Sequence, residues 1–69
     1  MLGEREATVR EVTAMEIHGV PYADLTVEFG DGVVASGRLG AESIPVDLAV
    51  GEHVLVQVAM SVMLSVRRP

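Results

Sequence analysis

The sequence contains no cysteine, no tryptophan and no lysine, and its only aromatic residues are Tyr22 and Phe29. Without cysteine the chain has no disulfide framework, no thiolate ligand for a metal ion and no cysteine nucleophile. Its five basic residues stand against ten Asp and Glu residues, which gives a formal net charge of −5. An acidic surface repels phosphate groups, and single-stranded nucleic acid binds by stacking on exposed aromatic rings. We therefore expect no nucleic-acid partner.

Long apolar runs and targeting signals are also missing. The longest unbroken apolar runs cover only a few residues, whereas a helix that crosses a bilayer needs about 20. The first residues, MLGEREATVR, lack the basic region followed by an apolar stretch that marks a signal peptide. We expect a cytoplasmic protein with no membrane insertion.

A chain of 69 residues predicts one domain, residues 1–69, with a marginal core. A domain of this size buries only about 60% of the surface that its unfolded chain exposes. Small domains often compensate with disulfides, metal ions or oligomerisation. Because disulfides are excluded, we expect a homo-oligomer or a complex with a larger protein.

β-Branched residues and glycines favour an all-β fold. The segment YADLTVEF alternates between apolar and polar residues, which predicts a strand. Its inward-facing side chains are Ala23, Leu25, Val27 and Phe29, and its outward-facing ones are Tyr22, Asp24, Thr26 and Glu28. The next residues, Gly30 to Gly32, favour a tight hairpin, because Gly and Asp adopt positive φ at little cost. A return strand over residues 33–39 follows, with a bulge or a bend at Gly37.

Two segments leave alternatives open. Residues 7–17 fit either a helix or a strand in which a bulge between Val9 and Val12 shifts the phase, and their β-branched content favours the strand. Residues 41–44 fit either a short turn of helix or a brief strand, before Pro45 ends the regular structure.

The C-terminal stretch VGEHVLVQVAMSVMLSV, from Val50 to Val66, is apolar at every even position from Val54 onward. This period of two predicts one long coiled strand, or two short strands, with a bend near Ala59 and Met60. The side chains expected to fill the core are Val54, Val56, Val58, Val62 and Leu64. The side chains expected on the second face, as an interface with another chain, are Leu55, Ala59 and Met63. Together the strands predict a small five-stranded OB-like barrel.

No cluster of residues predicts catalysis or a bound cofactor. His18 and His53 could share a metal ion with Glu16 or Asp47, or lie separately on the surface, and we expect the second arrangement. Nothing in the sequence raises the pKa of a carboxyl group, as a general acid requires, and no serine has an evident base partner. We expect a protein that is not an enzyme and that holds no metal or cofactor.

Three segments resemble the TOBE/Mop family of small β-barrels, which occur as molybdate-binding proteins and as accessory domains of transporter ATPases. ATVREV resembles the opening strand of that family, VEFGDGVVASGRL its central hairpin, and LAVGEHVLVQVAMSVMLSV its closing turn and strand. The resemblance implies a binding or assembly module that oligomerises or docks through its C-terminal strand and holds a small oxyanion at an interface. The ligand-binding residues that it implies are Ser36, Ser43 and Ser61, which alternatively are small residues that allow close strand packing. The family's Ser-Ala-Arg-Asn segment and its closing-strand lysine have no counterpart in this sequence.

A weaker resemblance connects the segment DLAVGEHVLVQVAMSVM with the HypC/HupF family of hydrogenase maturation chaperones. It implies a protein-binding chaperone or accessory subunit. Leu2 stands where that family has its N-terminal cysteine. The implied role is therefore recognition of a partner protein without the iron-ligand chemistry of the cysteine.

Overall fold

The computed structural model describes residues 2–69 as an all-β protein. Its elements are β1 (Leu2–Ile17), β2 (Val20–Phe29), β3 (Val34–Gly40), the 3-10 helix η1 (Ala41–Ser43), β4 (His53–Ala59) and β5 (Val62–Arg67). Neighbouring strands are antiparallel, in the order β3-β2-β1-β4-β5. The predicted all-β fold of five strands is confirmed, and of the two alternatives for residues 41–44 the structure has the helical turn. Within residues 2–69 no helix is long and apolar enough to span a membrane.

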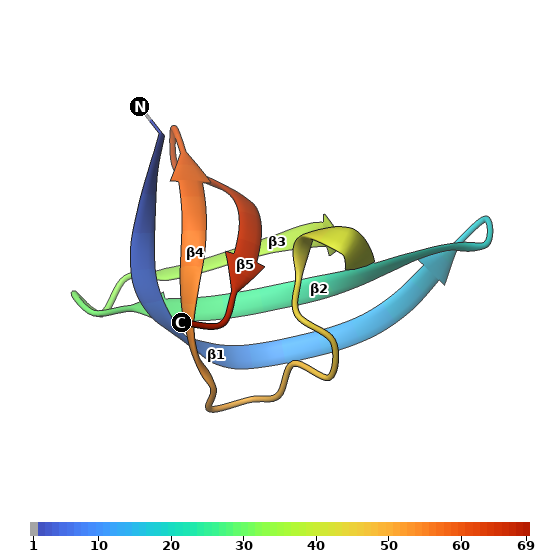
Figure 1. Ribbon diagram of the computed structural model, residues 1–69, viewed down its shortest axis with the longest axis horizontal. Helices are drawn as coiled ribbons and strands as arrows, with labels where there is room; N and C mark the ends of the chain where they lie inside the picture. The colour runs from blue at the N-terminus through green and yellow to red at the C-terminus, as the bar shows by residue number, and fades with distance from the viewer. Residues whose placement is uncertain (1) are drawn as a thin grey trace.

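β1 is long because it belongs to both halves of the sheet (Figure 1). Residues 2–8 pair with β4 and residues 7–17 pair with β2, so the strand curves across the molecule. The register shifts between Val9 and Glu11, which marks a β-bulge. The strand interpretation of residues 7–17 is thus confirmed, with a bulge inside the predicted interval, and the helical alternative is wrong.

The core lies inside the curl of the sheet and is built from apolar side chains of all five strands. Its buried members are Ala7, Val9, Leu25, Val27, Phe29, Leu39, Val54, Val56, Met63 and Val66. All four inward-facing residues predicted on β2 are buried, which confirms the alternation of that strand. On β4, Val54 and Val56 are fully buried as predicted, and Val58 packs against the core from its edge.

β3 and β5 are the two end strands of the sheet, and they lie against each other. A Cβ atom added to Gly37 would lie 3.2 Å from Cε of Met63, so the glycine leaves room for that side chain. The pairing of β2 with β3 is regular at Gly37, so of the two predicted alternatives, a bulge or a bend, the bulge is absent. Within residues 2–69 no ladder joins β3 to β5, and side-chain contacts rather than ladder hydrogen bonds connect the two ends of the curled sheet.

The predicted hairpin between β2 and β3 is confirmed at Gly30 to Gly32. Gly32 has the positive φ, at 86°. Its N–H donates to the Phe29 carbonyl at 2.9 Å. The Asp31 carboxylate accepts a hydrogen bond from the Val33 N–H at 3.0 Å, so a side chain as well as the backbone stabilises the turn.

The C-terminal stretch forms two strands rather than one. β4 and β5 are joined by a hairpin turn at Met60 and Ser61, whose φ values are 49° and 67°. The turn lies at the predicted bend, so the two-strand alternative is confirmed.

This turn inverts the predicted facing of β5. Ala59 pairs with Val62 and shares its outer face, so that the next residue, Met63, points into the core. A register shift then leaves Leu64 without a paired residue in β4. Met63 is only 7% exposed, whereas Val62 and Leu64 are 58% and 41% exposed. The predictions that Val62 and Leu64 fill the core and that Met63 faces a partner are wrong, because an alternation counted through a two-residue turn loses its phase.

Candidate functional site

The three predicted ligand-binding serines lie apart. Ser36 is on β3, Ser43 ends η1, and Ser61 is in the turn between β4 and β5. Each of them lines a different hollow of the surface. The structure therefore does not bring them together as one site.

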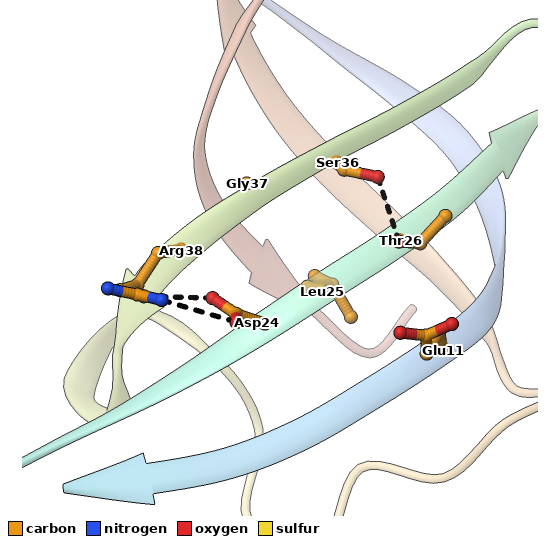
Figure 2. A pocket seen from close by; sticks show the side chains of 7 residues that line it. All are labelled: Glu11, Asp24, Leu25, Thr26, Ser36, Gly37 and Arg38. Carbon is orange, nitrogen blue, oxygen red and sulfur yellow. Dashed lines mark hydrogen bonds and ion pairs between the residues drawn. The ribbon is translucent and has the colours of Figure 1, made fainter.

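Figure 2 shows the hollow that contains Ser36, where β1, β2 and β3 lie side by side. The hollow has a volume of about 400 Å³ and is lined by Glu11, Asp24, Leu25, Thr26, Ser36, Gly37 and Arg38. The Arg38 guanidinium donates to both oxygens of Asp24, at 2.9 and 3.3 Å. The hydroxyls of Thr26 and Ser36 are hydrogen-bonded to each other at 2.8 Å. Most of the polar side chains in this hollow are thus paired across β2 and β3.

The ion pair in this hollow keeps its carboxylate charged. The hydrogen bond from Arg38 holds the pKa of Asp24 below its ordinary value of 3.8, and the carboxylate in turn raises the pKa of Arg38. Such a pair presents a fixed dipole on the surface.

Other carboxylates have the same character. Those whose pKa is also lowered are Glu4, Asp31 and Glu52. The first is lowered chiefly by a hydrogen bond from Arg67 and the last by one from Arg68. For Asp31 the largest cause is the hydrogen bond from the Val33 N–H. Every carboxyl group of residues 2–69 whose pKa is shifted is held ionised, the opposite of what a general acid needs.

A second hollow, which we call the end hollow, is lined by residues from both the β2–β3 and the β4–β5 turns. It is lined by Arg5, Phe29, Val33, Val34, Ala35, Val58, Ser61 and Met63. The Arg5 guanidinium lies 4.2 Å from the centre of the Phe29 ring, which is a cation–π contact. The same guanidinium donates a hydrogen bond to Asp31 at 3.1 Å. Apart from Arg5 and Ser61, the lining is apolar.

Exposed apolar side chains lie in the end hollow and next to it in the chain. Val33 and Val34 are 54% and 58% exposed, and Met60 and Val62, on either side of Ser61, are 85% and 58% exposed. We call Val33, Val34, Met60 and Val62 the apolar tip. Met60 also has a φ of 49°, which is rare for a bulky side chain. Backbone strain and clustered apolar exposure are both typical of binding surfaces.

The predicted interface of Leu55, Ala59 and Met63 is not a continuous stripe. Leu55 and Ala59 lie on the outer face of β4, where both are partly exposed. Leu55 lies opposite Glu6 on β1 and opposite Arg67 on β5, between two charged side chains. Met63 belongs to the core, so its side chain is not available to a partner.

The histidines lie in separate surroundings. His53 Nε2 is 3.1 Å from Oε1 of Glu6, and His18 occupies the turn between β1 and β2 with a φ of 50°. Across residues 2–69 no group of three or more His, Asp or Glu side chains is placed to hold a metal ion.

The apolar tip is the surface that sequence reasoning missed. Its turn, Met60 and Ser61, contains no Gly, Asn or Pro, which are the usual signals of a two-residue hairpin. The available signal was Ser61, a turn-favouring residue inside an otherwise apolar run.

No family model, curated protein or solved structure matches this chain. The two family resemblances therefore stay predictions.

Proposed function

We propose that this chain is a non-catalytic binding and assembly module that docks onto a larger protein through the apolar tip. The observation that carries the proposal is the exposure of Val33 and Val34 in the lining of the end hollow, together with that of Met60 and Val62 on either side of Ser61, which also lines it. Burying a side chain of this size is worth roughly 1.5–3 kcal/mol relative to leaving it in water. Interfaces draw most of their binding free energy from a few such residues.

The TOBE/Mop resemblance supports docking through the C-terminal hairpin, because Met60 and Val62 belong to that hairpin. A cytoplasmic assembly module of this type is the function that we favour. The HypC-like alternative uses the same surface for a one-to-one complex with a larger enzyme subunit. The stoichiometry of the complex separates the two.

Electrostatics support a non-catalytic role. The carboxylates with shifted pKa values are paired with arginines or with backbone N–H groups, and each is held in its charged form. Exposed arginine–carboxylate pairs of this kind add little stability, but the charge pattern that they fix contributes to specificity for a partner.

The oxyanion component of the proposal rests on the TOBE/Mop resemblance. Ser61 and Arg5 bring a hydroxyl and a guanidinium to the end hollow, although Arg5 already binds Asp31. Calorimetric titration with molybdate tests it. Saturable binding that is lost in a Ser61→Ala variant would support an anion site, and the absence of heat from the parent protein would remove the anion from the proposed function.

The docking component is tested with a double variant, Met60→Asp with Val62→Asp, and a matched control, Val46→Asp. Val46 is 79% exposed and lies outside the apolar tip. Tagged proteins are purified from the cells that naturally contain the chain. We expect one larger protein to co-purify in fixed stoichiometry with the parent and with Val46→Asp, and to be lost with the double variant, while all three have the same melting temperature. Equal recovery by the double variant would contradict docking through the tip.

A further inference from the structure

The outer half of β1 has a free edge. On the side away from β2, the ladder pairs with β4 end at Thr8. One more residue is paired by the loop before β4, where the Val9 N–H donates to the Glu52 carbonyl at 2.9 Å and the Gly51 N–H donates to the Val9 carbonyl at 2.8 Å. From Glu11 to Ile17, in the part of the chain that the structure describes, β1 has a strand beside it on the β2 side alone (Figure 1).

The turn at the end of this hairpin determines which backbone groups point to the free edge. His18 and Gly19 have φ values of 50° and 79°, which is a two-residue turn of type I′. In such a turn the flanking pair, here Ile17 and Val20, is the hydrogen-bonded pair. Hydrogen-bonded and non-hydrogen-bonded pairs then alternate along the two strands.

Counting back from the turn, every second residue of β1 directs its N–H and C=O away from β2. The residues whose backbone groups face the free edge are Val12, Ala14 and Glu16. Pro21 lies opposite Glu16 and fits this pattern, because a residue without an N–H is tolerated where the ladder needs no donor.

We propose that this edge pairs with the same edge of a second copy of the chain, as an antiparallel, two-fold symmetric β-interface centred on Ala14. The free stretch runs from residue 11 to residue 17, and residue 14 is its midpoint, so this register pairs the whole stretch with itself. Ala14 then exchanges backbone hydrogen bonds with Ala14 of the second copy. Val12 does the same with Glu16 of the second copy, and every edge-facing donor meets an acceptor. The contact is isologous, the usual form of a homodimer interface.

The side chains favour a second copy as the occupant. The residue on the symmetry axis is Ala14, which is exposed and small enough to let the two strands approach. Glu11 lies opposite Ile17 of the second copy, so that no two carboxylates face each other there. A register centred on Glu16 would place two carboxylates opposite each other, which is unfavourable. The stretch from 11 to 17 also lacks the lysine or proline that commonly protects an edge strand from pairing.

Apolar side chains on the outer face of the hairpin add to this contact. Met15 pairs with Tyr22, and Ile17 pairs with Val20. Ile17 and Val20 are 37% and 47% exposed. In the proposed register the Met15 side chains of the two copies are diagonal neighbours next to the symmetry axis, within reach of each other. The pairing therefore buries apolar surface as well as satisfying the backbone.

Net charge gives the interface a recognisable salt dependence. Each copy carries a formal charge of −5, so the two repel each other. Added salt screens this repulsion, and the dimer should become stronger as salt rises. An interface held by ion pairs would weaken instead.

Sedimentation velocity of the parent protein and of an Ala14→Pro variant tests the proposal. Proline at this position removes an edge-facing N–H that makes no bond to β2, so the hairpin is retained, as Pro21 shows on the opposite strand. The parent should form a dimer whose fraction rises with protein concentration and with sodium chloride between about 0.05 and 0.5 M. Ala14→Pro should stay monomeric with an unchanged circular dichroism spectrum. A parent that is monomeric at every concentration, or an Ala14→Pro variant that dimerises equally well, would overturn the proposal.

Disulfide trapping tests the register without a proline. The chain has no cysteine of its own, so Ala14→Cys and Glu16→Cys each introduce a single thiol at an exposed edge position. Cα atoms of a hydrogen-bonded antiparallel pair are about 5.5 Å apart, within the range that a disulfide bridges. With oxidised glutathione, Ala14→Cys should cross-link at least about tenfold faster than Glu16→Cys, whose two copies are offset in this register. Equal rates would overturn the register. The Met60→Asp, Val62→Asp double variant should dimerise as the parent does, which keeps this inference independent of docking through the apolar tip.

Discussion

Both halves of β1 mix apolar, β-branched and acidic residues, but their surroundings in the fold differ. In the inner half, residues 2–9, Ala7 and Val9 are 3% and 0% exposed, and Ala7 and Thr8 pair with both β2 and β4. In the outer half, residues 11–17, the strand pairs with β2 alone and Ala14 is exposed. Figure 1 shows the outer half extending beyond the curled part of the sheet with its partner β2.

The difference teaches that alternation and β-propensity establish a strand without establishing how many neighbours it has. The inner half is held by core packing, since Val9 contacts the buried cluster that includes Val54 and Val56. The outer half depends on its hairpin and on whatever pairs with its edge. Stability and association are therefore expected to respond to different residues of one strand.

The first test compares a charged side chain in the core, which packs against the inner half of β1, with one on the outer half. Equal tolerance of the two would contradict the contrast. Val56 is fully buried, so Val56→Glu places an unpaired charge in the core and should abolish cooperative folding. Ala14→Lys, on the exposed edge, should leave the free energy of unfolding within about 0.5 kcal/mol of the parent. Urea unfolding followed by circular dichroism measures both. A Val56→Glu variant with the parental midpoint would contradict the description of the core.

A second pair of variants tests which side chains of β5 face the core. Met63 packs into the core beside Gly37, so Met63→Ala should lower the free energy of unfolding by about 2–5 kcal/mol. Val62→Ala, one residue earlier and 58% exposed, should change it by less than about 0.5 kcal/mol. Similar losses from the two variants in chemical denaturation would mean that the facing of β5 is misassigned.

Glycine substitutions test whether the outer hairpin, formed by β1 and β2 around the turn at His18 and Gly19, unfolds together with the core. Gly32 lies in the β2–β3 turn and Gly19 in the β1–β2 turn, with φ values of 86° and 79°. Alanine at either position should cost about 1 kcal/mol, because L-residues are strained at positive φ. Gly30→Ala is the control, since Gly30 lacks a positive φ, and it should cost only a few tenths. If Gly19→Ala leaves global unfolding unchanged while Gly32→Ala lowers it, the outer hairpin opens separately from the core.

The smallest effect expected is a pH dependence from the paired carboxylates. The pKa values of Glu4 and Glu52 are lowered from 4.5, and that of Asp24 is lowered from 3.8. The unfolded chain therefore binds protons more readily, and these groups stabilise the folded state above their unfolded pKa values. The contribution is lost as pH falls through the lower, folded values. The melting temperature should be flat between about pH 6 and 7 and fall below about pH 4.5. A melting temperature that rises on acidification would contradict the sign.

The sequence predicted the elements of the fold better than their facing. Alternation was reliable along β2, where Ala23 to Phe29 contain no interruption. It failed after Met60, because the two-residue turn, signalled only by Ser61, reverses the side that the next residue faces. The β1 bulge was predictable, since Val9 and Val12 are out of phase for an uninterrupted strand.

The candidate surfaces were less predictable. The three serines share a residue type but lie on β3, η1 and a turn, and only three-dimensional placement separates them. The apolar tip combines residues at the β2–β3 turn with residues at the β4–β5 turn, which are far apart in sequence. The free edge of β1 depends on where β4 stops pairing, and no property of residues 11–17 indicates that position.

Amide hydrogen exchange, measured residue by residue at low and at high protein concentration, tests the contrast within β1 most directly. In dilute solution the edge-facing N–H groups of Val12, Ala14 and Glu16 should exchange much faster than those of Val54 and Val56 in the core. In concentrated solution the three edge amides should become protected together, while the core amides stay as they were. Edge amides that exchange at the same rate at both concentrations would contradict pairing with a second copy, and edge amides already protected in dilute solution would contradict a free edge on β1.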